Sequence, residues 1–247
     1  MLFAHTDKIL DAGFERIMVE KPGSLNSGDL EKLIKKGEEK NVTMYINYQR
    51  SFDARVSALF ENIKKMVAEG FTLDYVSVYS CDKEQPPQAA HQFLNQGCHD
   101  YALLLSVFEA SGMKLKDLQA RGVEWKGTGG DTKFFKVTGT AGNDSANALY
   151  DVQMGRVNSS GSFTTIYVKL SKFDEASKMY LPFEETLNFP EVPDPNANWA
   201  DVWKGSFEKS AEALYKGENG VPIKFGLNTL KFAEMAGKSL SDKSSLI

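Results

Sequence analysis

The chain has 247 residues, of which 42% are hydrophobic and 25% charged, and its formal net charge is -4. These values are typical of a globular protein with a real core, and the acidic balance argues against a nucleic-acid-binding surface. No apolar run is long enough for a membrane span, and residues 1–4 are too short for a signal peptide. The two cysteines and the lack of any metal-ligand spacing predict free thiols, a cytoplasmic or other reducing compartment, and no metal site.

The first fifty residues alternate between helical and strand patterns. In order, the sequence predicts a helix over residues 5–11, a strand over 16–20, a helix from Ser27 to about residue 41, and a strand over 42–48. Ser27 is a suitable N-cap, and acidic residues in the following turn favour a helix start. This order is typical of the parallel sheet of an α/β protein.

The pattern changes after Arg50. In order, we predict an amphipathic helix over residues 56–67, a strand over 71–80, a helix over 96–110, about five strands between 118 and 189, and helices over 200–217 and 224–239. Tyr150, Val152 and Met154 alternate with polar residues, which predicts a largely antiparallel sheet with one covered face. The fold class is therefore α/β plus α+β.

Lys21 lies at the carboxyl end of the first predicted strand, directly after Glu20. Open α/β sheets bind their ligands at this end, and Pro22 would fix the direction in which the chain leaves. The lysine can point into a cleft, where partial burial tunes its proton affinity, or it can be a surface lysine at a strand exit.

His99 begins a predicted helix and shares a helical face with Asn95, four residues earlier. Such a histidine can act as a general acid or base near neutral pH, or it can bond to its neighbours as a structural residue.

Three other features predict turns or surfaces. Residues 127–130 read Gly-Thr-Gly-Gly, but they lack the spacing of a dinucleotide fingerprint and precede a strand, so we predict a turn. Asp144 and Asp151 border predicted strands, where we expect turn or solvent-facing groups. The alternation around Tyr150 also predicts a broad sheet face available for self-association.

Several segments, taken in order, resemble the Gfo/Idh/MocA family, the group of glucose–fructose oxidoreductase and inositol dehydrogenase. Residues 5–22 run from a leading histidine into Glu-Lys-Pro, residues 47–52 read Asn-Tyr-Gln-Arg-Ser-Phe, and residues 96–100 read Gln-Gly-Cys-His-Asp. Residues 221–240 resemble the family's closing helix. The resemblance implies two domains. Residues 1–50 would be the remnant of a Rossmann-like parallel sheet. Residues 51–247 would form a substrate and oligomerisation domain with a mixed or antiparallel sheet and flanking helices.

The resemblance also implies a site, because the family's lysine and histidine line a substrate cleft beside the nicotinamide of NAD or NADP. It implies catalytic roles for Lys21, His99 and Asn95, cofactor contacts from Glu20, Lys21 and Pro22, and substrate contacts from Arg50, Lys21 and His99.

Two departures from the family affect this site. Asn95 stands where the family has an aspartate, and an amide cannot hold a proton as a carboxylate does. The family also has roughly 60–80 residues, or two βαβ units, before the matching segment, including the glycine-rich turn that binds the pyrophosphate. We therefore expect an N-terminally truncated chain whose dinucleotide site is mostly absent.

Three functions remain open. The chain can be an NAD(P)-dependent oxidoreductase acting on a sugar or cyclitol hydroxyl, with its missing part supplied by another chain or by an upstream start. It can be a sugar-binding pseudoenzyme that keeps the pocket. It can be a structural or assembly subunit that uses the open sheet face in a homo-oligomer or with a protein partner.

Overall fold

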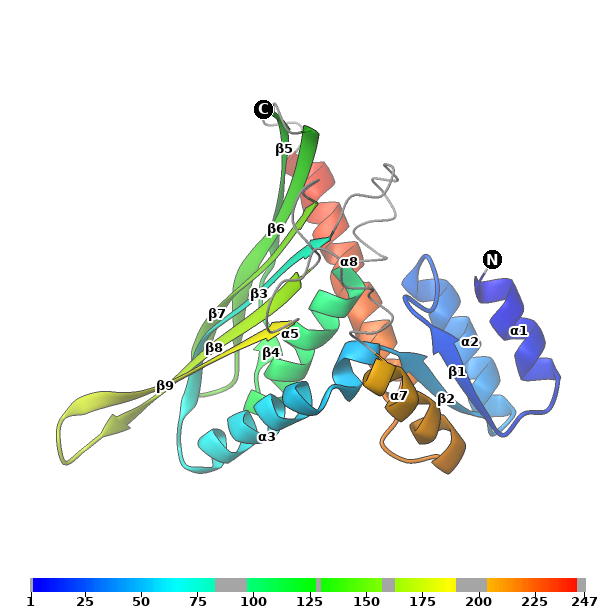
Figure 1. Ribbon diagram of the computed structural model, residues 1–247, viewed down its shortest axis with the longest axis horizontal. Coiled ribbons are helices and arrows are strands. Elements are labelled where there is room, and N and C mark those ends of the chain that lie inside the picture. Colours follow the sequence, from blue (N-terminus) through cyan, green and yellow to red (C-terminus); the bar gives the residue numbers. More distant parts are fainter. Residues whose placement is uncertain (1, 83–96, 128–129, 157–162, 190–203, 244–247) are drawn as a thin grey trace. The chain divides into compact units, whose positions relative to one another are not determined.

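The computed structural model describes residues 2–82, 97–127, 130–156, 163–189 and 204–243 (Figure 1). They divide into two compact units, which we describe separately. The first unit comprises residues 2–53, 97–102 and 204–235, and the second comprises the other described residues. The first unit thus includes two segments, 97–102 and 204–235, that the sequence analysis assigned to the domain over 51–247.

The first unit is built around two parallel strands. Its elements are α1 (Leu2–Asp11), β1 (Arg16–Glu20), α2 (Ser27–Glu39), β2 (Thr43–Asn47), the 3-10 helix η1 (Gln49–Phe52), the start of α5 (Gly97–Ser111), α7 (Lys204–Lys216) and the first part of α8 (Ile223–Lys243). The pair β1–β2 runs from Arg16 opposite Thr43 to Glu20 opposite Asn47. The predicted helix–strand–helix–strand order is confirmed.

Helix α2 covers this strand pair with its apolar side. Leu30 and Leu33 are buried in one cluster with Val19 of β1 and Ile46 of β2. The N-cap of α2 is Asn26 and not the predicted Ser27. The Asn26 side chain accepts a hydrogen bond from the Asp29 N–H at 2.8 Å. Both Asn and Ser suit an N-cap, so composition alone does not separate neighbouring candidates.

One edge of β2 is covered from far along the chain. The Ile46 N–H donates a hydrogen bond to the Val221 carbonyl at 2.9 Å, and Tyr45 forms a bridge with Pro222. These bonds satisfy backbone groups of β2 that β1 does not reach.

The second unit is a mixed sheet with helices on one face. Its strands are β3 (Thr72–Asp82), β4 (Lys114–Leu115), β5 (Gln119–Gly127), β6 (Gly130–Gly142), β7 (Asn147–Arg156), β8 (Phe163–Asp174) and β9 (Met179–Phe189), and α3 (Ala54–Ala68) precedes them. The described strands are ordered β4-β6-β7-β3-β8-β9, with β5 paired to β6. The five strands expected between 118 and 189 are confirmed. Gly127 pairs with Gly130 across the β5–β6 connection, whose Thr128 and Gly129 lie outside the described residues.

The described strand pairings within residues 118–189 are antiparallel, as predicted, and the parallel pairing of the sheet involves β3. Strand β3 lies between β7 and β8, parallel to β7 and antiparallel to β8. The insertion makes the sheet mixed, and β3 enters it from outside the 118–189 segment.

The two faces of this sheet differ. Tyr150, Val152 and Met154 are buried, and Phe108 of α5 contacts the Tyr150 ring edge-on at 5.4 Å between centroids. The predicted covered face is therefore confirmed, but these residues cannot form an open apolar face. Leu149 lies on the opposite face, and self-association through that face remains a prediction.

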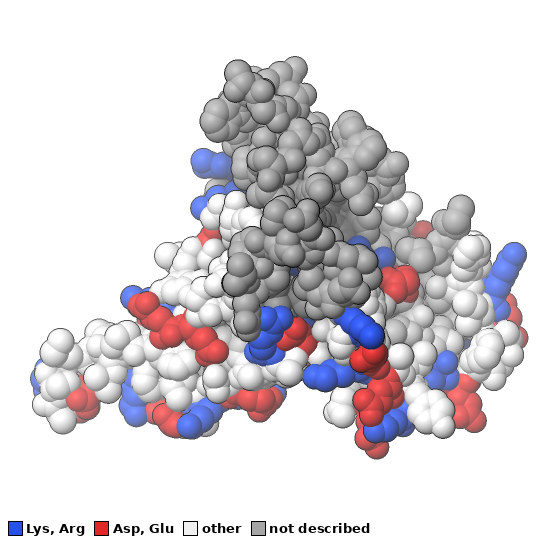
Figure 2. Space-filling view, in the orientation of Figure 1, with Lys and Arg blue, Asp and Glu red and all other residues white. Residues whose placement is uncertain are grey.

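Charged side chains are mixed on the surface. Figure 2 shows Lys and Arg interspersed with Asp and Glu on the visible part of the described surface, as the balanced composition predicts. No helix in the described part of the chain is long and apolar enough to cross a membrane.

Candidate functional site

Lys21 follows β1 in a tight turn. The Gly23 N–H donates to the Glu20 carbonyl at 2.9 Å, which closes a four-residue turn around a cis Lys21–Pro22 peptide bond. Gly23 has φ +88°, a conformation that suits glycine, and a Cβ there would press on the Leu30 methyls at 3.2 Å. The turn leaves Lys21 half-buried and Pro22 buried at the carboxyl end of the sheet.

The ends of the two strands are joined by their side chains. The Asn47 amide nitrogen donates a hydrogen bond to the exposed Glu20 carboxylate, and these residues face each other in the register. Glu20 therefore holds the strand ends together. Its expected contact with a cofactor remains a prediction.

His99 lies in the first turn of α5 and is only 4% exposed. Its ring stands edge-on to Tyr48, with 5.9 Å between the centroids. Its Nδ1 has no hydrogen-bond partner among the described residues. A buried polar atom without a partner is costly, so this nitrogen is suited to a ligand group.

Burial and neighbouring charges favour the neutral form of His99. Burial lowers the pKa of His99 well below its ordinary value, and the positive charges of Arg50 and Lys21 lower it further. At neutral pH the imidazole can therefore accept a proton or a hydrogen bond. Lys21 and His99 both belong to the first unit, where the charge of Lys21 acts on the His99 ring.

Cys98 lies beside His99 but is not reactive. Burial raises the pKa of the Cys98 thiol to about 12, and the charge of Lys21 opposes this shift only in part. Because the thiolate is the nucleophilic form, Cys98 is a core residue.

Arg50 is held by a partner that the sequence analysis did not identify. Its guanidinium Nη1 bonds to the Asp100 carboxylate at 2.7 Å, and both side chains are buried. Asp100 was missed because the pair joins positions fifty residues apart. Its only local signal is an acidic side chain next to His99 in a helical first turn. Substrate contact by Arg50 remains a prediction.

Asn95 lies outside the described residues. In the described part of the chain, no group of three or more His, Cys, Asp or Glu side chains is arranged to hold a metal ion.

Comparison with known proteins shows similarity in structure. No family model and no curated protein sequence matches the chain. A probable dehydrogenase from Thermotoga maritima superimposes with a TM-score of 0.69 at 20% identity, covering 98% of this chain and 76% of the other. Scyllo-inositol dehydrogenase from Lactobacillus casei, with bound NAD(H) and scyllo-inositol, gives 0.69 at 15% identity, covering 98% and 76%. UDP-N-acetylglucosamine 3-dehydrogenase from Acidithiobacillus ferrooxidans gives 0.63 at 15%, covering 97% and 75%.

The chain has the fold of these dehydrogenases. At these identities the similarity establishes the fold alone, and it agrees with the resemblance found in the sequence.

The N-terminus of α2 is occupied by a side chain from far along the chain. Helix α2 starts after the β1 turn, and helix N-termini in general bind anions. Its N-terminus already binds a carboxylate, because the Ser27 N–H and hydroxyl donate to Glu234 at 2.6 and 2.7 Å. Asp29 adds negative charge in the first turn. The 247 residues contain no Gly-x-Gly-x-x-Gly segment.

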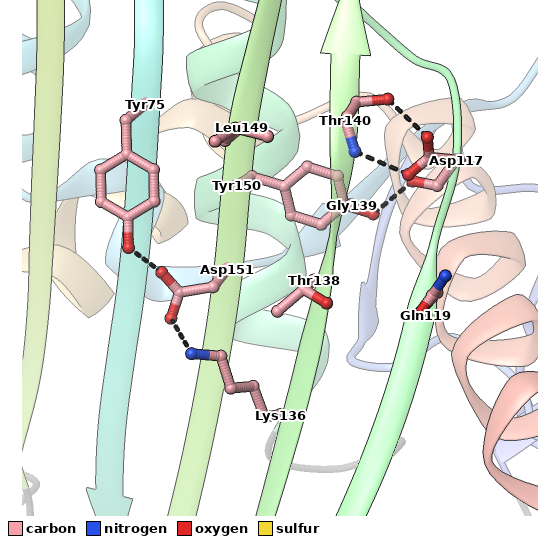
Figure 3. A pocket seen from close by; sticks show the side chains of 10 residues that line it. All are labelled: Tyr75, Asp117, Gln119, Lys136, Thr138, Gly139, Thr140, Leu149, Tyr150 and Asp151. Atoms are coloured by element: carbon pink, nitrogen blue, oxygen red, sulfur yellow. Dashed lines mark hydrogen bonds and ion pairs between the residues drawn. The ribbon is translucent and has the colours of Figure 1, made fainter. Parts of the chain in front are cut away.

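A half-open pocket of about 390 Å³ lies on the open face of the second unit's sheet. Figure 3 shows Asp151 of β7 between Tyr75 and Lys136 on the neighbouring strands. Asp151 is buried, so its predicted turn or solvent-facing position is wrong, whereas Asp144 is exposed as predicted. The carboxylate of Asp151 is already bound by its neighbours Tyr75 and Lys136.

Proposed function

We propose that the chain is an NAD(P)-dependent oxidoreductase of the Gfo/Idh/MocA type that acts on a sugar or cyclitol hydroxyl and is impaired as this chain alone. The observation that carries the proposal is the buried neutral imidazole of His99, with an unpartnered Nδ1, next to the charge of Lys21. The bound scyllo-inositol of the Lactobacillus casei enzyme supports a cyclitol as the substrate class.

The two residues have complementary roles toward a hydroxyl group. Neutral His99 accepts the hydroxyl proton, and the Lys21 ammonium stabilises the negative charge that develops on the oxygen. Asn95 contributes no carboxylate to this proton transfer. The loss of general acid–base help is typically worth about 10²–10⁴ in rate, so residual activity from Lys21 and His99 is expected.

Cofactor binding is the weak part of the site. Glu234 occupies the N-terminus of α2, so this helix offers no free donors to a phosphate group.

The test is calorimetry of scyllo-inositol, myo-inositol and simple sugars with the purified chain, followed by turnover assays with NAD and NADP. We expect saturable binding of a polyol that Lys21→Met and His99→Gln each weaken at least tenfold. Lys32→Met, which removes an exposed lysine of α2, serves as the matched control. Equal binding by all variants, or no binding of any polyol, would contradict the proposal.

A second candidate is a non-catalytic sugar-binding or assembly subunit. This candidate is favoured by Asn95, which replaces the family's catalytic aspartate, and by Glu234, which occupies the N-terminus of α2. Polyol binding without turnover at any nucleotide concentration would support sugar binding alone. Stable association in light scattering, lost when the open sheet face is altered by Leu149→Lys, would support an assembly role.

A further inference from the structure

The strongest feature beyond the proposed pair is the ion pair next to His99. Arg50 and Asp100 are joined at 2.7 Å, with side chains 7% and 0% exposed. A buried ion pair is rarely retained for stability, because apolar residues of similar volume often do as well or better. Its position therefore needs another explanation.

The pair connects the two segments that hold the His99 ring. Arg50 belongs to η1, two residues after Tyr48, and Asp100 follows His99 in the first turn of α5. Tyr48 is the edge-on partner of the His99 ring. One ion pair thus fixes the Tyr48 segment against the His99 segment, at the contact between the two rings.

We propose that the Arg50–Asp100 ion pair is a positioning device that holds His99 edge-on to Tyr48, with Nδ1 left for a substrate hydroxyl. This inference rests on the proposed function for the role of His99, but the geometry can be tested without any substrate. Asp100 acts through His99 and is a positioning residue.

The pair also governs the charge that His99 experiences. The groups that act on the ring are Lys21 from the β1 turn and Arg50 from η1, while Cys98 and Asp100 flank it in α5. Removal of the Arg50 charge would raise the pKa of His99, because one of the two cations that lower it is gone.

The experiment is NMR of the histidine rings in the full chain without nucleotide or sugar. The sequence has three histidines, so His5→Gln and His91→Gln variants assign the His99 signals. In the parent chain we expect a neutral His99 ring at neutral pH, with ring-current shifts and cross-relaxation from Tyr48.

The decisive variant is Arg50→Met/Asp100→Leu, which replaces both charges by apolar groups and is expected to fold. We expect it to lose the Tyr48–His99 cross-relaxation, because the ion pair no longer fixes the two segments to each other. Arg50→Lys keeps the positive charge but loses the planar guanidinium with its several N–H donors. It should therefore keep His99 neutral and weaken the contact between the His99 and Tyr48 rings. The matched control is Lys224→Met/Glu38→Leu, an exposed pair in the same unit, which should change neither signal.

An unchanged His99 tautomer and Tyr48 contact in both Arg50 variants would overturn the proposal and leave the pair a purely structural link. That outcome would not affect polyol binding, and failure of polyol binding would not alter the NMR result. The two proposals can therefore fail separately.

Discussion

The imidazole of His99 and the ring of Tyr48 meet edge-on, with 73° between their planes. Tyr48 also contacts Phe225 of α8 edge-on at 6.3 Å and is only 1% exposed. It therefore joins the core of the first unit to the candidate site.

Replacement of Tyr48 by alanine should destabilise the chain strongly. Loss of a fully buried aromatic side chain costs about 3–5 kcal/mol in the free energy of unfolding, which urea denaturation would measure. Tyr215→Ala is the control, because Tyr215 is 84% exposed and surface changes stay within about 0.5 kcal/mol. Similar costs for the two variants would show that Tyr48 does not pack as described.

The pH dependence of stability should report the buried His99. Burial, Arg50 and Lys21 lower the pKa of His99 in the folded chain, so below about pH 6.5 the unfolded state binds a proton that the folded state does not. The free energy of unfolding should therefore fall by about 1.4 kcal/mol per pH unit as the pH drops below about 6.5, until the folded pKa is reached. Above that pH, His99 contributes no slope.

His99→Gln is the variant that isolates this effect. It removes the titrating ring, so the difference in slope between parent and variant over about pH 5–7 belongs to His99. Carboxylates with lowered pKa, such as Asp174, lose their contribution at lower pH and cancel in the difference. Parallel curves for the two proteins would mean that His99 is protonated or exposed in the folded state.

The sequence predicted the elements better than their partners. Periodicity gave the helices and the five strands, because it depends on which side of each element is buried. It could not place β3 between β7 and β8, since alternation fixes the faces of a strand but not its neighbours. The same limit applies to Asp151, whose partners Tyr75 and Lys136 come from two other strands.

For the candidate site, the sequence likewise named residues but not their contacts. Lys21 and His99 followed from motifs, and the structure brings them within electrostatic range. The ion pair of Arg50 with Asp100 had no local signal, because no spacing rule connects a strand exit to a helix start fifty residues later. Local chemistry identified the groups, and only the tertiary fold paired them.

The two cysteines should be unreactive in the folded chain. Cys81 and Cys98 are buried and form no disulfide, and burial raises the pKa of Cys98 to about 12. Ellman's reagent at about pH 8 should therefore titrate almost no thiol in native protein and both thiols in urea. Rapid reaction of the native chain would show that the end of β3 or the start of α5 opens to solvent.

Gly139→Ala should destabilise the second unit. A Cβ at Gly139 would collide with the Asp117 carbonyl oxygen and lie 2.7 Å from the Tyr150 hydroxyl, which bonds to that same oxygen (Figure 3). Because the obstacle is backbone, we expect a cost of about 1–3 kcal/mol in thermal or urea denaturation. Gly237→Ala is the control, since a Cβ there meets nothing within 4 Å and alanine favours a helix. A neutral Gly139→Ala would contradict the close approach of Asp117 to β6.

The 247-residue chain should not bind NAD, NADH, NADP or NADPH with micromolar affinity. Dinucleotide binding in this fold depends on backbone amides of a glycine-rich turn and of the helix N-terminus behind it, and the 247 residues contain no Gly-x-Gly-x-x-Gly turn. The donors of Ser27 at the N-terminus of α2 are bound to Glu234 and cannot replace it. Asp29 in the same turn would also repel a phosphate.

Calorimetry with the four nucleotides tests this directly, with Glu234→Ala as the informative variant. Removal of the Glu234 carboxylate frees the N–H and the hydroxyl of Ser27. Weak nucleotide binding by Glu234→Ala, with none by the parent, would show that Glu234 blocks these donors in the parent chain. Glu31→Ala removes a carboxylate that pairs with Lys231 on the same two helices, and it should leave binding unchanged. Micromolar binding by the parent chain would mean that other backbone donors hold the pyrophosphate, because those of Ser27 are already used.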